Sequence, residues 1–238
     1  DTYALRFDEN LNPLDSAPFI LVPGYSLSAL SANDSQFYIV WVQQMPDFSI
    51  AVLGSRVDTN GTMLDGDGDN ISVANQPDPY TTTSVAWDGT TWRASWSHSN
   101  TLSVARISSD GQVLDPGGVS IPGPTSGVTA GTSLGGIQIA WANYVNWDND
   151  ILTASISAAN TPGPNTTLST GAPMQIRSDV AAGSNGYMFA YLSDTATQSR
   201  VLAQPLDASG VPLTPEPIEL AAGSQIGAPT YPNVAWNG

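Results

Sequence analysis

The stretch Leu102–Pro122, LSVARISSDGQVLDPGGVSIP, contains the pattern from which the rest of this 238-residue chain is built. Its Leu114-Asp115 pair recurs at Leu64-Asp65 and at Leu14-Asp15, a step of 50 residues each time. Three arginines keep the same step: Arg6, Arg56 and Arg106. Weaker copies follow at 152–157 and 202–214. A step that is kept over several copies indicates a repeat architecture.

A second motif keeps the same step and consists of a small apolar run, a turn, and an apolar run that ends in an aromatic residue. The clearest copy is Ser84–Trp96, SVAWDGTTWRASW. The aromatic residues that end the copies are Trp41, Trp96, Trp141 and Tyr191. Because they recur at one place in the unit, we expect them to pack between units, together with Trp87 and Trp236.

Each unit contains four short apolar runs separated by turn residues. Leu102–Ile107 alternates apolar and polar positions, which is the period of a β-strand. Pairs such as Asp88-Gly89 and Asn185-Gly186 readily adopt the positive φ angles of tight hairpins. The sequence therefore predicts an all-β fold, a β-propeller of four-stranded antiparallel blades. A β-sandwich is the alternative, but a sandwich has no reason to keep a 50-residue step.

We expect one β-propeller domain over residues 1–238. The predicted blades, in chain order, are 1–22 (partial), 27–74, 83–121, 128–169, 179–220 and 233–238 (partial). The first range supplies the third and fourth strands of a blade, and the last range begins a first strand. This arrangement favours a five-bladed ring over an arc of a larger propeller.

The composition is acidic and excludes some partners. The chain has 21 Asp and Glu against 6 basic residues, and its formal net charge is −15. We therefore expect no nucleic-acid binding, since phosphates would be repelled. No apolar run is long enough to span a bilayer, so we expect no membrane insertion. Cysteine is absent, so the redox compartment cannot be inferred. Low charge with abundant Ser, Thr, Asn and Gly favours an extracellular or cell-surface location.

The two motifs together, VAWDG, an apolar strand ending in Trp, and VARIxxxGxxLDPGGxxI, resemble the propeller repeats of many large bacterial secreted and surface-attached proteins. The architecture is also similar to five-bladed lectins of the tachylectin type, although no sugar-site motif of theirs is matched. The resemblance implies a binding, adhesion or scaffolding module that is tethered to other domains of a longer chain.

The segment Asp65–Asn70, DGDGDN, is a candidate cation site. Its three carboxylates are Asp65, Asp67 and Asp69. Oxygen ligands that alternate with glycine can surround a hard cation such as Ca²⁺. A full EF-hand loop is absent, because Gln76 stands where a bidentate Glu is required. The alternative is a solvated acidic turn, since the counterparts Asp15 and Asp115 lack the added carboxylates. We expect no other cofactor.

The segment 143–150, NYVNWDND, stands where other units have a short connection and is a candidate glycan site. Aromatic rings can cover the apolar face of a pyranose, while amides and carboxylates bind its hydroxyls. The predicted ligand-binding residues are Tyr144, Asn146, Trp147 and Asp148. The alternative is that Trp147 packs on the neighbouring blade.

Catalysis requires carboxylates near the propeller axis, where propeller glycosidases place them at the start of the innermost strands. Asp179 lies at such a place, but the equivalent positions of the other units supply no second acid. His98 is the single histidine, and the pattern gives it no Ser or Asp partner. We therefore expect a non-catalytic extracellular module that binds a glycan or a protein. A structural subunit of a surface layer or fibre and a propeller glycoside hydrolase are the alternatives.

Overall fold

The protein is described by a computed structural model over residues 1–8, 10–24, 28–74, 82–98, 101–122, 126–133, 136–145, 148–169, 174–224 and 232–235. Regular structure in these ranges consists of β-strands. None of the described residues forms a helix long and apolar enough to cross a membrane.

Four antiparallel sheets of four strands follow one another along the chain, and we call each a blade. Blade 1 contains β3 (Ser28–Ala32), β4 (Phe37–Gln44), β5 (Ile50–Val57) and β6 (Asp69–Ala74). Blade 2 contains β7 (Thr83–Trp87), β8 (Thr91–His98), β9 (Thr101–Ser108) and β10 (Val119–Pro122). Blade 3 contains β11 (Ser126–Ser133), β12 (Gly136–Val145), β13 (Asp148–Ser157) and β14 (Thr166–Ser169). Blade 4 contains β15 (Met174–Ala182), β16 (Gly186–Asp194), β17 (Gln198–Asp207) and β18 (Ile218–Ser224). A sheet of β1 (Thr2–Ala4) and β2 (Phe19–Val22) precedes them and is called the partial blade.

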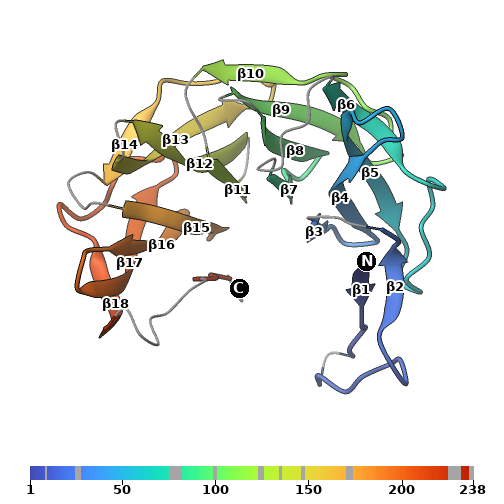
Figure 1. The fold of residues 1–238 in the computed structure, drawn as a ribbon, viewed down its shortest axis with the longest axis horizontal. Coiled ribbons are helices and arrows are strands. Elements are labelled where there is room, and N and C mark those ends of the chain that lie inside the picture. The colour runs from blue at the N-terminus through green and yellow to red at the C-terminus, as the bar shows by residue number, and fades with distance from the viewer. Residues whose placement is uncertain are drawn as a thin grey trace.

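The predicted fold class, a β-propeller of four-stranded antiparallel blades, is confirmed. Figure 1 shows the blades side by side around an open arc, with the first strand of each blade nearest the centre. The partial blade and blade 4 form the two ends of this arc. Successive strands of a blade run in opposite directions. The start of the first strand therefore lies on the same face of the arc as the hairpin that joins the second and third strands. We call this the hairpin face and the opposite one the turn face.

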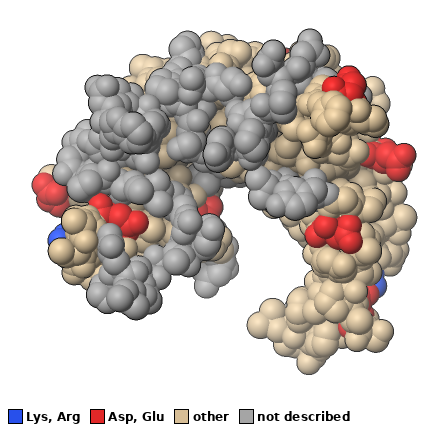
Figure 2. All heavy atoms as spheres, in the orientation of Figure 1, with Lys and Arg blue, Asp and Glu red and all other residues tan. Residues whose placement is uncertain are grey.

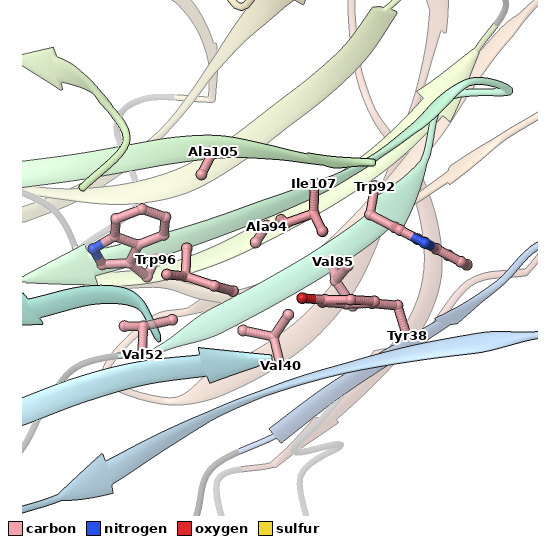
Figure 3. Packing of buried hydrophobic residues seen from close by; sticks show 10 residues of the cluster. Tyr38, Val40, Val52, Val85, Trp92, Ala94, Trp96, Ala105 and Ile107 are labelled. Atoms are coloured by element: carbon pink, nitrogen blue, oxygen red, sulfur yellow. The ribbon is translucent and has the colours of Figure 1, made fainter. Parts of the chain in front are cut away.

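Blades 1, 2 and 3 each lie between two neighbours, which explains why their central strands are buried on both faces. In β8, Trp92, Ala94 and Trp96 pack toward blade 1, against Tyr38 and Val40, as Figure 3 shows. The rings of Tyr38 and Trp92 stack with their centroids 5.6 Å apart. Similar apolar clusters join blades 2 and 3, blades 3 and 4, and the partial blade and blade 1.

The turn after the third strand has the same form in every sheet. The N–H of its fourth residue donates to the C=O of its first residue, and the fourth residue has a positive φ. The fourth residues are Leu11 (63°), Gly61 (82°), Gly111 (93°), Asn160 (61°) and Gly210 (85°). In the four complete blades this turn leans on the blade before it. For example, Gln36 Nε2 of blade 1 donates to the Ser109 carbonyl of blade 2 at 2.7 Å.

The observed strands differ from the predicted ranges at two inner strands and at the last segment. β11 begins at Ser126, and β15 begins at Met174 rather than at Asp179. The pairing of β15 shifts register between Ile176 and Asp179, and such a bulge interrupts the alternation from which a strand is predicted. Residues 232–235 have no regular secondary structure, although a strand was predicted to begin at 233.

Candidate functional site

The repeated arginine and aspartate residues form ion pairs in the partial blade and in blades 1 and 2. In blade 1, Arg56 Nη2 lies 2.6 Å from Asp65 Oδ1, and the Arg56 backbone N–H donates to Asp65 Oδ2 at 2.8 Å. Arg6 with Asp15 and Arg106 with Asp115 make the same two kinds of contact. Each pair ties the turn back to the third strand, which explains the 50-residue step as a structural device.

These contacts also determine the protonation of the aspartates. Side-chain hydrogen bonds from Arg6 and Arg106 lower the pKa of Asp15 and of Asp115. Burial acts to raise the pKa of Asp65, but the hydrogen bonds from Arg56 outweigh it, and the pKa is lowered. All three carboxylates are therefore ionised partners of an arginine.

The Asp65 pairing bears directly on the predicted cation site. Its carboxylate already accepts hydrogen bonds from Arg56, while Asp67 and Asp69 are exposed. Gly68 is explained by packing, because a Cβ there would lie 2.2 Å from Trp41 Cη2. Among the described residues, no group of three His, Cys, Asp or Glu is placed to hold a metal ion. The Ca²⁺ site at Asp65, Asp67 and Asp69 stays an untested prediction, and the contacts of Asp65 and Gly68 have a structural explanation.

A buried polar cluster joins blades 2 and 3, and the sequence did not reveal it. Arg93 donates to Asp88 Oδ2 at 2.7 Å, to Asn160 Oδ1 at 3.1 Å and to the Ala158 carbonyl at 2.8 Å. Asn160 in turn donates to the Val104 carbonyl and to Asp115, both at 3.0 Å. Burial acts to raise the pKa of Asp88, but backbone N–H donors and Arg93 lower it to about 2. The signal in the sequence was an arginine inside the apolar strand 91–98.

The recurring aromatic residues lie where the repeat placed them. Trp41, Trp96, Trp141 and Tyr191 are all buried. Each belongs to an apolar cluster between two blades. Trp87 is partly buried and packs on Trp92, whereas Trp236 lies outside the described residues. Trp41, Trp96, Trp141 and Tyr191 therefore pack between blades.

The candidate glycan segment forms an extended hairpin. The β12–β13 ladder continues through Ala142↔Ile151 to Val145↔Asp148. Asn146 and Trp147 lie outside the described residues, as do the side chains of Tyr144 and Asp148. The predicted ligand-binding role of these four residues is therefore untested. What the backbone establishes is that their hairpin lies on the hairpin face of blade 3.

Asp179 is the acidic residue among the described first strands β3, β7, β11 and β15. Its Oδ2 accepts the Val234 backbone N–H at 2.8 Å, and its Oδ1 accepts the Val180 N–H at 2.9 Å. Val180 belongs to the same apolar cluster as Ala142 and Ile151, the residues at the base of the β12–β13 hairpin. Asp179 itself pairs with Ala190 in the middle of blade 4, whereas the β12–β13 hairpin of blade 3 extends to Val145↔Asp148 on the hairpin face.

Comparison with known proteins gives a fold but no family. No family model matches the chain, and no curated protein matches it. A thermostable family-43 glycoside hydrolase aligns with a TM-score of 0.50 and 10% identity, covering 83% of this chain and 75% of its own. A subtype N10 neuraminidase-like protein of A/little yellow-shouldered bat/Guatemala aligns with a TM-score of 0.51 and 10% identity, covering 76% and 56%. A putative 6-phosphogluconolactonase from Bacteroides uniformis aligns with a TM-score of 0.50 and 16% identity, covering 92% and 62%. At these identities the likeness concerns the fold.

These findings correct the expectation of a non-catalytic binding or scaffold module. That expectation rested on the resemblance to surface-protein repeats, and no family model supports it. The fold is instead one that a propeller glycoside hydrolase also has, over most of this chain. What the comparisons establish is a β-propeller fold.

Proposed function

We propose that this protein is a propeller glycoside hydrolase whose substrate binds near the centre of the arc at Asp179 of β15 and reaches the β12–β13 hairpin on the hairpin face. The observation that carries this proposal is the position of Asp179. It is a half-buried carboxylate on a first strand, close to the centre of a fold shared with a family-43 glycoside hydrolase. Concave regions at the centre of such a ring are where ligands bind and where catalytic carboxylates meet a sugar.

Glycoside hydrolysis needs two carboxyl groups with different roles. One donates a proton to the leaving oxygen, and the other acts as nucleophile or as base toward water. Two backbone N–H donors fix the orientation of Asp179, which suits the second role. The hairpin supplies Asp148 and Asp150 as candidates for the proton donor. In this proposal Tyr144, Asn146 and Trp147 bind the sugar beside them.

Elsewhere the described surface of the hairpin face is also acidic. Asp47 lies in the β4–β5 connection, and Asp194 ends β16. Figure 2 shows carboxylates scattered over the described surface, with few basic groups. An acidic face disfavours a phosphorylated or other polyanionic substrate. We therefore propose a neutral glycan, encountered outside the cell, as the substrate.

A panel of nitrophenyl glycosides and plant and bacterial polysaccharides would test the activity, with released reducing sugar as the readout. On the substrate that is turned over, Asp179→Asn should lower kcat by about 10²–10⁴-fold. Trp147→Ala should raise KM and leave kcat largely unchanged. Asp207→Asn is the control, because Asp207 caps an exposed loop on the turn face.

Two results would overturn the proposal. The first is the absence of turnover over the whole panel by the folded protein. The second is turnover that Asp179→Asn leaves unchanged. Asp179→Asn keeps one acceptor oxygen for the two N–H groups of Val180 and Val234, and an unchanged urea midpoint would show that any lost activity is not lost folding.

A further inference from the structure

The first turn of the chain carries an apolar residue where the other turns carry glycine or asparagine. Leu11 has φ 63° and a side chain that is 79% exposed. A left-handed conformation is unfavourable for a residue with a Cβ, and leucine cannot offset this with a local side-chain hydrogen bond. The equivalent Asn160 has nearly the same φ and is almost fully buried in the blade before it. Leu11 therefore stands at a position that contacts the preceding blade in the complete blades, but no blade among the described residues covers it.

The residue at the start of the same turn gives a second, independent sign. One residue in each sheet bridges across this turn: Phe7, Val57, Ile107, Ile156 and Leu206. In the four complete blades its exposure is 4, 0, 1 and 1%. In the partial blade Phe7 is 51% exposed, and Tyr3 and Ile20 beside it are also exposed. The outer face of the partial blade is thus one half of an inter-blade interface.

The other half is present at the opposite end of the arc. In blades 3 and 4 the turn docks at one position in the second strand of the blade before it. Asn160 Oδ1 meets Arg93, and a Cβ on Gly210 would lie 2.7 Å from Gln138 Nε2. Met188 is the equivalent residue of blade 4, because it occupies the same place in the pairing of second and third strands. The equivalent pairs are Arg93↔Arg106, Gln138↔Ser155 and Met188↔Pro205. Among the described residues no turn covers Met188, which is 36% exposed.

The chemistry of the two free ends matches. Around Met188 lies a pocket of about 460 Å³ whose lining includes Leu206, Leu213, Val234 and Ala235. Leu213 is 62% exposed. Within the arc, a polar turn residue (Asn160) meets a polar receiving residue (Arg93). At the ends, an apolar turn residue (Leu11) is matched by an apolar receiving pocket.

We propose that the exposed face of the partial blade binds blade 4 of a second copy of this chain, with Leu11 inserted in the pocket at Met188. The two faces lie at opposite ends of the arc and do not meet within one molecule (Figure 1). The contact would repeat the blade-to-blade packing already present inside the chain. Because the two faces differ, the association is head-to-tail, and it leads to closed rings or to filaments.

Sedimentation velocity with complementary variants tests this proposal. The unaltered chain should show concentration-dependent association from low-micromolar to several hundred micromolar protein. Leu11→Asp and Met188→Glu should each abolish association, because each buries a charge in an apolar contact. Aspartate also tolerates a positive φ, so Leu11→Asp should not disturb the turn itself. Leu114→Asp, at an exposed leucine in the middle of the arc, is the control and should associate like the unaltered chain.

An equimolar mixture of Leu11→Asp and Met188→Glu should form a 1:1 dimer and nothing larger. Each pair of molecules then has one intact interface, made by Leu11 of one copy and Met188 of the other. An unaltered chain that stays monomeric at every concentration would overturn the proposal. So would single variants that still associate, or a mixture that stays monomeric. None of these outcomes depends on enzymatic turnover.

Discussion

The buried Arg93 cluster allows a stability prediction in which the matched control is a cross-strand neighbour. Arg93 of β8 pairs in register with Arg106 of β9, and both make ion pairs with aspartate. Their surroundings differ. The Arg93 side chain is 1% exposed, whereas that of Arg106 is 29% exposed. Replacing each by methionine removes the same charge at two depths.

The expected magnitudes follow from the contacts that each change leaves unmade. Arg93→Met removes the donors to the Ala158 carbonyl and to the buried Asn160, and removes the counter-charge of Asp88. Breaking a buried pair in this way costs about 3–5 kcal/mol. Asp88 keeps four donors from Thr90 and Thr91, so we expect about 3 kcal/mol. For Arg106→Met we expect at most about 1 kcal/mol, as for other exposed ion pairs.

Urea unfolding followed by tryptophan fluorescence measures the difference. With an m value of about 3 kcal/mol/M, the midpoint should fall by about 1 M for Arg93→Met and by about 0.3 M for Arg106→Met. If the two variants lost equal stability, depth of burial would not determine the strength of these pairs. A midpoint for Arg93→Met equal to that of the unaltered chain would refute the argument altogether.

Two further outcomes can be checked with the same assay. The folded pKa of Asp88 is about 2, below its usual 3.8, so its contribution is fully present above pH 3.8 and is lost as the pH falls through 2. Unfolding free energy should therefore fall by about 2 kcal/mol over this range, and Asp88→Asn should remove that part of the pH dependence. Gly118→Ala should cost about 2–4 kcal/mol, since a Cβ there lies 2.5 Å from Trp96 Cη2 at a positive φ. Gly117→Ala, with a positive φ but open space, should cost only about 1–2 kcal/mol.

The features that the sequence predicted correctly are those that depend on local chemistry. Alternation and Asp-Gly pairs are local signals, and they located the strands and turns from which the propeller class follows. The Arg56 and Asp65 repeat was visible because the two residues are only nine positions apart in the sequence. The start of β15 was not visible, since its bulge breaks the alternation before Asp179.

The features that the sequence did not reveal depend on which blade a residue faces. Arg93 and Asn160 are 67 residues apart, and nothing in either local pattern links them. The candidate site has the same difficulty, because Asp179 lies on β15 and the predicted glycan residues lie on the β12–β13 hairpin. Asp179 pairs with Ala190 in blade 4, whereas the hairpin belongs to blade 3, and the two blades meet where Val180 packs with Ala142 and Ile151. The functional interpretation was wrong because it rested on a resemblance between repeats, which no family model supports.

The turn after the third strand also explains how nearly identical repeats keep their order. Its fourth residue points at the preceding blade in each complete blade, so any side chain there must be matched by that blade. Gly61 and Gly111 each leave room for a close neighbour. The neighbour of Gly61 is Phe19, and the neighbours of Gly111 are Arg56 and Asp65. Asn160 requires donors and acceptors, and blade 2 supplies them through Arg93, Val104 and Asp115. If one blade were exchanged for another, a buried polar group would be left unpaired or the space beside a glycine would be left empty. Each unpaired buried polar group costs about 1–3 kcal/mol. The residue at this position and the blade that it faces must therefore match at each interface. For the same reason, the apolar Leu11 indicates an apolar surface as its partner.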